Sequence, residues 1–203
     1  ESITAFYVMP KINYTDLITF IPGVRYERVN NKYYGHNFYN LVGTSPTPVK
    51  EEYVLNDTTA TQKYDDILPM THLKIKPADW LDFRFSVTKT LSRPNFTYLM
   101  PVQSLNTWTG SNVYLGNPNL KPARAFNFDA YTSVYTSTFG LISVGYFEKS
   151  IDDVAVLYRV FVDDNMMENG LPEFDIPVLD DSQRGHVGLY AGNNLLTPIN
   201  LKE

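Results

Sequence analysis

The sequence contains few side chains whose types and spacing could support catalysis or metal binding. Its three histidines, His36, His72 and His186, lie far apart along the chain, and there is no cysteine. Thiolate metal sites, thiol catalysis and a disulfide scaffold are therefore excluded. The sequence also lacks a phosphate-cradling glycine loop, a nucleophile elbow and a paired-histidine zinc motif. We predict that the protein is not an enzyme, that it needs no cofactor or metal, and that the histidines are solvated polar residues.

An acidic segment, residues 163–181, is the other cluster of potential ligands. Met167 occupies a position at which a calcium-binding loop needs an oxygen, and Gly170 falls too late in the segment for that loop. We interpret the segment as a solvated loop. A loop that is stabilised by calcium or attracts cations is the alternative.

Aromatic side chains are better suited to binding. They gather in residues 30–40 and 105–114, beside Asn and Thr, where exposed rings could stack against a ligand. The candidate ligand-binding residues are Tyr33, Tyr34, Tyr39, Trp108 and Tyr114. The same rings could instead pack the loops on one another, so the sequence leaves ligand contact and structural packing open.

The composition limits both the fold and the partners. Hydrophobic residues make up 43% of the 203 residues, and the 15 Tyr and 12 Phe favour strands over helices. The net charge of −5, without a basic cluster, argues against nucleic acid as a partner. No run of about 18 apolar residues could form a spanning helix, but a spanning β-strand needs only about 9–11 residues.

Apolar and polar residues alternate with a period of two, which predicts strands. Residues 81–92 show it best: Leu81, Phe83, Phe85, Val87 and Leu91 share one face with Lys89, and the other face is polar. Similar patterns predict strands over 18–29, 67–75 and 126–135, although Pro22 weakens the first. The alternation is weaker over 2–14 and 141–151, and another strand starts within 197–203.

Parity along these strands assigns side chains to the two faces. Phe126 and Phe128 fall on the apolar face, whereas Asn127 falls on the polar face. If the strands close into a barrel, the polar face lines its lumen. The predicted lumen-lining residues are Arg25, Glu27, His72, Arg84, Asp129 and Tyr131.

Short and long connections alternate along the chain. Short turns are predicted at 14–16, 77–80 and 136–140, and long irregular loops at 30–63, 93–122 and 163–185. Tight turns at one end of a sheet and large loops at the other indicate an antiparallel, up-and-down transmembrane β-barrel. A soluble β-sandwich, whose strands also alternate, is the alternative.

Two motifs carry a resemblance to a known family. LSRPNFTYLMP (91–101) followed by GNPNLKPARAFNFDAY (116–131) resembles a motif pair in the barrels of TonB-dependent outer-membrane receptors. Residues 21–27, 64–77 and 143–154 resemble other blocks of the same barrels, in the same order. The motif residues, to which we assign a structural role, are Arg93, Pro94, Gly116, Asn117, Pro118, Leu120 and Pro122. One departure is that the family commonly has a glutamate after the second proline, where this chain has Ala123 and then Arg124, so the ion pair made there is in doubt.

The resemblance implies a fold and a function. Residues 1–203 would be part of one all-β barrel domain, contributing six to seven strands of a larger plugged barrel, with the plug and the TonB-contact segment outside this chain. The implied function is TonB-coupled uptake of a bulky, scarce nutrient (a siderophore, cobalamin, glycan or peptide) across the outer membrane of a Gram-negative bacterium. The implied partners are outer-membrane lipid, the TonB energising complex, the nutrient and a surface lipoprotein. A passive outer-membrane porin or adhesin, and a soluble carbohydrate-binding β-sandwich, are the alternatives.

Overall fold

The computed structural model describes residues 2–42, 50–101, 103–106, 112–138, 140–161 and 194–201, with side chains outside 36–42, 50–57, 103–106 and 112–113. Within that part, no helix is both long and apolar enough to cross a membrane. The chain forms two compact units. Unit 1 comprises Glu1–Asn30, Lys63–Ser92 and Ala123–Asp152, and unit 2 comprises Asn31–Gln62, Arg93–Pro122 and Asp153–Glu203.

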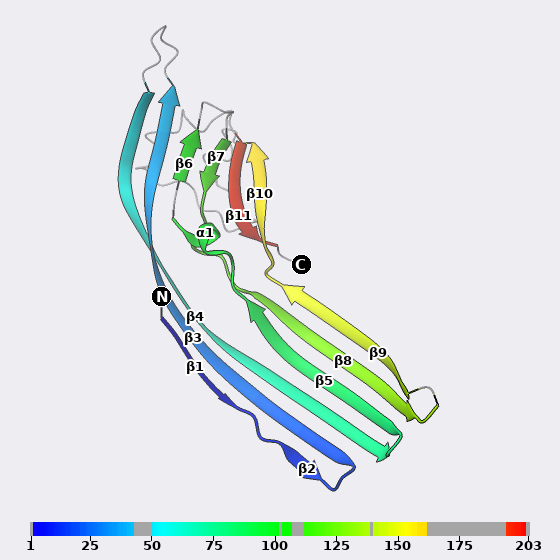
Figure 1. Cartoon of the computed structure of the whole chain (residues 1–203). Coiled ribbons are helices and arrows are strands. Elements are labelled where there is room, and N and C mark those ends of the chain that lie inside the picture. The colour runs from blue at the N-terminus through cyan, green and yellow to red at the C-terminus, as the bar shows by residue number, and fades with distance from the viewer. Residues whose placement is uncertain are drawn as a thin grey trace. The chain divides into compact units, whose positions relative to one another are not determined.

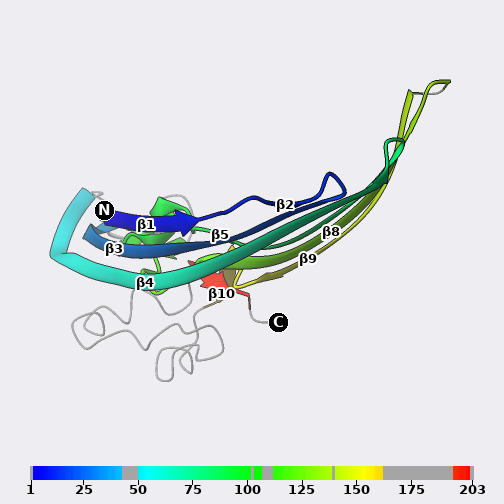
Figure 2. The ribbon, with the colours of Figure 1, turned by 90° about the horizontal axis from the view of Figure 1, so that it is seen from below.

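Unit 1 is a sheet of antiparallel strands. It contains β1 (Ser2–Val8), β2 (Ile12–Tyr14), the first part of β3 (Ile18–Val42), the last part of β4 (Lys50–Ala78), β5 (Leu81–Ser92), β8 (Ala123–Thr136) and β9 (Gly140–Asp152). The order is β3-β4-β5-β8-β9, and β1 and β2 both pair with the free edge of β3 (Figure 1). In the view from below, β8 and β9 again lie side by side (Figure 2).

The register of these strands places like faces together. β5 pairs with β8 from Leu81↔Val134 to Ser92↔Ala123, so that Phe85 lies opposite Ala130 and Ser86 lies opposite Asp129. Because side chains alternate between faces, this register aligns the polar face of each strand with that of its neighbour. The strand predicted at 81–92 is confirmed with the same bounds, and those predicted at 126–135 and 141–151 are confirmed with slightly wider ones.

The three predicted short turns are confirmed. Turns lie at 15–17, 79–80 and 137–138. In the first, Thr15 has φ 58°, a left-handed backbone that is uncommon for a β-branched residue, and Gly140 after the third has φ 77°. The amide of Lys76 donates to the carbonyl of Leu17 at 2.7 Å, which links the end of β4 to a neighbouring turn.

Unit 2 is built around shorter strands. It contains the end of β3, the start of β4, α1 (Phe96–Leu99), β6 (Gln103–Asn106), β7 (Asn112–Leu115), β10 (Ala155–Phe161) and β11 (Asn194–Asn200). Their order is β10-β11-β7-β6-β3-β4. The short pairings of β3 with β6 and of β7 with β11 are parallel, a departure from the purely antiparallel expectation.

The long irregular loop predicted over 30–63 is wrong. β3 continues to Val42 and β4 begins at Lys50. The Asn-rich start of this segment has a low strand propensity, but pairing with neighbouring strands overrides that preference. Strand β10 was also missed, because only the weaker alternation up to residue 151 was interpreted as strand.

Burial differs between the units. In unit 2, Tyr33, Leu99 and Leu120 form a buried hydrophobic cluster, against which Tyr98 and Ala155 pack. In unit 1, large apolar side chains on one face are exposed, among them Phe6, Ile67, Phe126 and Val144. The aromatic rings of Phe128 and Tyr146, with centroids 6.2 Å apart, lie on that same face.

Candidate functional site

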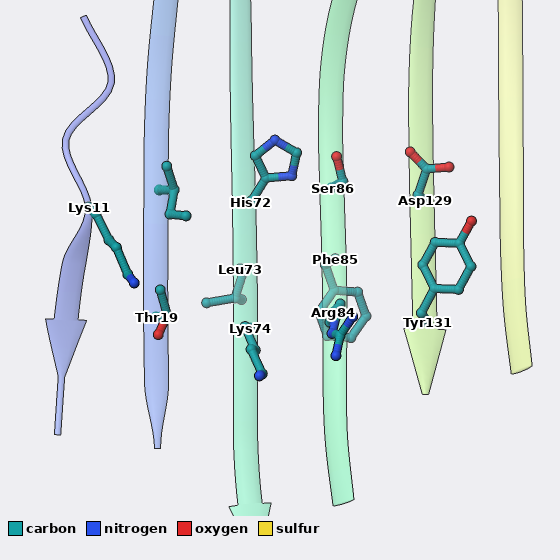
Figure 3. Close-up of a pocket in the computed structure, with 11 residues that line it drawn as sticks. Lys11, Thr19, His72, Leu73, Lys74, Arg84, Phe85, Ser86, Asp129 and Tyr131 are labelled. Carbon is teal, nitrogen blue, oxygen red and sulfur yellow. The ribbon is translucent and has the colours of Figure 1, made fainter. Parts of the chain in front are cut away.

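The polar face of unit 1 contains a pocket of about 620 Å³ (Figure 3). Strands β3, β4, β5 and β8 line it, together with Lys11 from the connection between β1 and β2. Four of the residues predicted to line a lumen meet here, namely His72, Arg84, Asp129 and Tyr131. Lys11, Lys74, Thr19 and Ser86 also line the pocket but were not predicted as site residues.

The strand register arranges these side chains in two rows. In one row Lys74 pairs with Arg84, which pairs in turn with Tyr131. In the other row His72 pairs with Ser86, and Ser86 pairs with Asp129. Figure 3 shows the two rows one above the other on adjacent strands. The two cationic side chains therefore lie in one row with the Tyr131 hydroxyl, and the imidazole, the serine hydroxyl and the carboxylate lie in the other.

Asp82 supports the cationic row. Its side chain is 1% exposed, and its Oδ2 accepts hydrogen bonds from Arg84 Nη2 and Tyr135 Oη, both at 3.0 Å. Lys74 Nζ lies 3.7 Å from the same oxygen. A buried carboxylate with these three partners restricts Arg84 and Tyr135 to defined positions. Parity already places Asp82 and Arg84 on one face, a signal that could have identified Asp82.

The ring of Tyr131 covers a glycine on the neighbouring strand. Tyr131 pairs directly with Gly145 on β9, and a Cβ on Gly145 would overlap the tyrosine ring. The absence of a side chain on Gly145 thus leaves room for the ring to lie flat beside the pocket. Glycine in a strand often marks such a close approach.

Arg25 and Glu27, the other two predicted lumen residues, pair with each other outside the pocket. Arg25 Nε donates to Glu27 Oε1 at 2.5 Å. Both have the same parity along β3 as Thr19, which lines the pocket. Between them, Tyr26 has the opposite parity, and its hydroxyl donates to Asp65 at 2.6 Å together with Arg28 at 2.7 Å. This second polar group on the apolar side of β3 was not predicted.

The departure from the family pattern at Ala123 and Arg124 comes with an ion pair of its own. Arg124 Nε donates to Asp66 Oδ1 at 2.8 Å, and the Asp66 side chain is 5% exposed. The second oxygen of Asp66 has no hydrogen-bond partner. A buried carboxylate depends strongly on its cation, so Arg124 stabilises the start of β8 against β4.

The motif residues of unit 2 form a hydrogen-bonded hub around Asn117. The main-chain N–H of Asn117 donates to the carbonyl of Tyr98 at 2.7 Å, and its side-chain Nδ2 donates to the carbonyl of Pro198 at 3.1 Å. Its Oδ1 accepts from the amide of Asn119 at 3.0 Å. The buried Asn117 therefore joins three segments through their main-chain groups.

The side-chain amides of Asn200 and Gln62, which were not predicted as site residues, hydrogen-bond to the main chain at Leu120 and Lys121. Asn200 Oδ1 accepts from the amide of Lys121 at 2.8 Å, and Asn200 Nδ2 donates to the carbonyls of Lys121 and Asp153. Gln62 Nε2 donates to the carbonyl of Leu120 at 2.5 Å. Leu120 itself is 1% exposed in the hydrophobic cluster.

The remaining motif residues flank this hub. Arg93 and Pro94 lie between β5 and α1, whose N-cap Asn95 accepts from the amide of Thr97 at 3.1 Å. Gly116 is buried so closely against the carbonyl of Met100 that a Cβ would overlap it. Pro118 lies in the turn after Asn117, and Pro122 is buried just before β8.

The predicted ligand-binding aromatics do not form one cluster among the described residues. Tyr33 is 4% exposed in the hydrophobic cluster, and its hydroxyl donates to Gln62 at 3.2 Å, so for this ring the structure favours the packing alternative. Tyr34 is 65% exposed, and Lys32 Nζ lies 5.0 Å from its ring centroid. The Tyr114 hydroxyl donates to the carbonyl of Thr97 at 3.0 Å, and burial raises the pKa of Tyr114.

Several other predicted features lie outside what the structure describes. The backbone of Tyr39 belongs to β3, but its side chain is not described, and the same holds for His36. Trp108, His186 and the acidic segment 163–181 lie outside the described residues. Among the described residues, no three His, Asp or Glu side chains gather as a metal site would require.

Comparison with known proteins identifies the family and the fold. The family described as "TonB dependent receptor-like, beta-barrel" matches residues 1–174. No curated protein matches the chain. The hemophore receptor HasR of Serratia marcescens, solved with its hemophore HasA and heme, superposes with a TM-score of 0.61 at 14% identity, over 98% of this chain and 29% of that one.

Two receptors of Pseudomonas aeruginosa give similar results. The ferric enterobactin receptor PfeA, solved with enterobactin, has a TM-score of 0.58 at 13% identity, over 98% of this chain and 22% of that one. The siderophore receptor PirA has a TM-score of 0.56 at 15% identity, over 98% of this chain and 28% of that one. The chain therefore spans less than a third of the length of these structures.

These results confirm the predicted fold class. The chain is a fragment of an all-β barrel built mostly from antiparallel strands. The soluble β-sandwich alternative is wrong, because the sheet matches the wall of a barrel and not one of two stacked sheets. At such low identity, the solved structures support the fold alone.

Proposed function

The chain belongs to the TonB-dependent receptor family, and from that premise we propose that it is part of a receptor that takes up a bulky, scarce nutrient across the outer membrane. The observation that carries this proposal is the family match over residues 1–174, on a sheet with one apolar and one polar face. Members of this family are outer-membrane receptors and transporters, not enzymes. Uptake by binding and gating needs no catalytic constellation.

The two faces of unit 1 suggest how the wall works. The exposed apolar residues, such as Phe126 and Val144, would contact lipid, and the strands would cross the outer membrane repeatedly. The polar face, with the pocket around Arg84, would line the lumen. Residues 1–203 would form part of a single barrel domain, whose plug and TonB-contact segment belong to the rest of the receptor.

We propose an iron chelate as the nutrient, by analogy with two structures that share the fold of this chain. HasR is a hemophore receptor solved with heme, and PfeA is a ferric enterobactin receptor. We extend this to the chain as iron-chelate uptake, energised through TonB, with a surface lipoprotein as a further partner. Exposed aromatic rings such as Tyr34 suit the capture of a flat ligand.

Uptake assays test this function directly. Deleting the receptor gene should abolish energy-dependent accumulation of one nutrient, and deleting TonB should have the same effect. Complementation with the intact receptor restores uptake in the first strain only. Uptake that persists without TonB would contradict the proposal and favour a passive porin, whereas surface attachment without any uptake would favour an adhesin.

A further inference from the structure

The outward positions of unit 1, meaning those on its apolar face, become charged along one line across the sheet. On β3, β4 and β8, the outward positions within residues 18–26, 67–75 and 126–134 carry no charge. Each run is about nine residues long, close to the about 9–11 residues with which a β-strand spans a membrane. Toward the loop end, the first charged outward residues on β3, β4, β5, β8 and β9 are Arg28, Asp65, Lys89, Arg124 and Glu148.

This line crosses the strands obliquely. Glu148 on β9 lies level with Val87 on β5, through one shared pairing partner on β8. Asp65 on β4 lies farther toward the loop end, because Met70 already pairs with Thr88. Barrel strands are tilted by about 35–45° from the barrel axis, so a boundary that is level in the membrane crosses them in this way. The line therefore fits the outer limit of the apolar layer of a membrane.

Two tyrosines lie on the apolar side of this line and donate to carboxylates on it. The Tyr26 hydroxyl donates to Asp65 at 2.6 Å, and Arg28 donates to the same carboxylate at 2.7 Å. The Tyr146 hydroxyl donates to Glu148 at 3.1 Å. Tyrosine is enriched where the apolar layer of a membrane meets its headgroups, because its ring is apolar and its hydroxyl is polar. Both carboxylates thus have partners within the protein.

Lys89 differs from these charged residues in its surroundings. It is exposed, it lies between Val87 and Leu91 on the outward face of β5, and it pairs with Phe126 on β8. Within the described part of the chain, no carboxylate forms an ion pair with its ammonium group. An unpaired ammonium group is costly in hydrocarbon, so a lysine on a lipid-facing strand extends toward the headgroups. Because this face points away from the lumen, a plug inside the barrel does not cover it.

We propose that Lys89 binds the phosphate of a lipid headgroup at the outer limit of the apolar layer. The phosphate provides the counter-ion for the ammonium group, as a charge-assisted hydrogen bond. The acyl chains lie along the neighbouring rings of Phe126 and Phe128, which suits an amphiphile better than free phosphate. This inference rests on the proposed function, because it needs the apolar face to lie against lipid, and it adds a defined headgroup site to that wall.

The test uses the complete receptor in phosphatidylcholine vesicles at fixed ionic strength, with a nitroxide on the acyl chains of some lipids. A bimane fluorophore on Phe126→Cys reports lipid contact beside Lys89, once any cysteines elsewhere in the receptor are replaced. Unlabelled dioleoyl phosphatidic acid displaces the nitroxide lipids if it binds at this position. It should relieve quenching about 3-fold more effectively than unlabelled phosphatidylcholine does, since one ion pair near a membrane surface has about this effect.

Three substitutions locate the cause of this preference. Lys89→Gln should abolish it, whereas Lys89→Arg, which keeps the charge, should retain it. Lys149→Gln is the matched control, because it removes the same charge from the polar face, where Lys149 pairs with Asn127. This control should change the preference by less than about 1.5-fold. Heat-dependent mobility on gels confirms that each variant is folded.

A second fluorophore position tests whether the preference is local. Ile142 lies on the same apolar face near the turn end and pairs with Val134. Bimane on Ile142→Cys should therefore respond equally to phosphatidic acid and phosphatidylcholine.

Four results would overturn the inference. These are no preference in the wild type, an unchanged preference in Lys89→Gln, the same preference at position 142, and loss of the preference when inorganic phosphate replaces chloride. The last would mean that the site takes free phosphate. A receptor that supports TonB-dependent uptake but gives any of these results would keep the proposed function and lose only the headgroup site. Uptake that persists without TonB, together with a clear preference at position 126, would refute the proposed function and keep the site.

Discussion

Unit 1 and unit 2 differ in where their large apolar side chains lie, exposed on a sheet face in unit 1 and buried in a cluster in unit 2. Unit 2 has a small hydrophobic cluster of Tyr33, Leu99 and Leu120, and side-chain amides satisfy the main chain around it. Unit 1 exposes large apolar side chains on one face of its sheet, and on the other face the buried Asp82 binds Lys74 and Arg84. Buried apolar side chains thus cluster in unit 2, whereas unit 1 has the exposed apolar face expected of a barrel wall.

Because the two units bury apolar side chains to different extents, different substitutions should destabilise each of them. In unit 2, removing buried apolar volume leaves a cavity that nothing fills. In unit 1, the apolar face would meet lipid tails, which adapt to a smaller side chain. The sensitive positions of unit 1 should therefore be its few buried charges and not its exposed hydrophobic residues.

The largest effect is expected for Leu120→Ala in unit 2. Leu120 is 1% exposed, so its truncation should lower the free energy of unfolding by about 3 kcal/mol. The matched control in unit 1 is Ile142→Ala, because Ile142 is 52% exposed and should lose less than about 1 kcal/mol. Urea unfolding of the complete barrel in micelles measures both, and equal losses would remove the contrast between the units.

The next effect is expected for Arg124→Met in unit 1. This change leaves the buried carboxylate of Asp66 without its ion pair and should destabilise the fold by about 2–3 kcal/mol. Adding Asp66→Leu should recover most of the loss, because the unpaired charge is removed as well. A double-variant cycle by urea unfolding checks this, and losses that simply add would show that the pair does not act as a unit.

A comparison of two glycines sharpens the same contrast. Gly116→Ala should lower stability by about 2 kcal/mol, since its Cβ would overlap the carbonyl of Met100 inside the hub. Gly140→Ala should lower it by only about 1 kcal/mol, because that site is open and only its positive φ of 77° is unfavourable for alanine. Thermal unfolding would refute the hub if Gly140→Ala were the more harmful substitution.

The smallest effect concerns a turn of unit 1. The hydrogen bond from Lys76 Nζ, 2.8 Å from Asp79, lowers the pKa of Asp79 below its ordinary 3.8. A carboxyl group whose pKa is lower in the folded protein stabilises the fold at pH values above 3.8. This stabilisation is lost as the pH falls through the lower pKa of the folded state. Asp79→Asn should therefore reduce the melting temperature slightly at pH 7 but not at pH 2, and a constant difference would contradict this assignment.

The sequence could predict much of unit 1, because alternation is a strong signal where one face is apolar. Residues 81–92 gave the strand bounds correctly, and parity placed His72, Arg84, Asp129 and Tyr131 on one face, where the structure brings them together. Parity did not single out Lys11, Lys74 or Asp82 as site residues. Lys11 lies outside the regular strands, and the role of Asp82 depends on which cross-strand neighbours it meets.

Unit 2 was harder to predict, for physical reasons. Its strands carry polar residues on both faces, so the alternation in residues 31–42 and 50–62 is weak and was interpreted as a loop. The sequence left open whether Tyr33 contacts ligand or packs, because its burial depends on Leu99 and Leu120, which are distant in sequence. The hydrogen bonds of Asn200 to Lys121 could not be foreseen either, since local sequence carries no information on such long-range contacts.

Cysteine scanning along β5 tests whether this sheet is a barrel wall with one face toward lipid and the other toward a polar lumen. Because the chain has no cysteine, single substitutions at Phe83, Arg84, Phe85, Ser86, Val87 and Thr88 report each position separately once any cysteines elsewhere in the receptor are replaced. In outer-membrane vesicles, a charged, membrane-impermeant maleimide should label positions 84, 86 and 88. Lipid-soluble maleimide should prefer 83, 85 and 87. Labelling that does not alternate, or alternates with the opposite phase, would contradict the account.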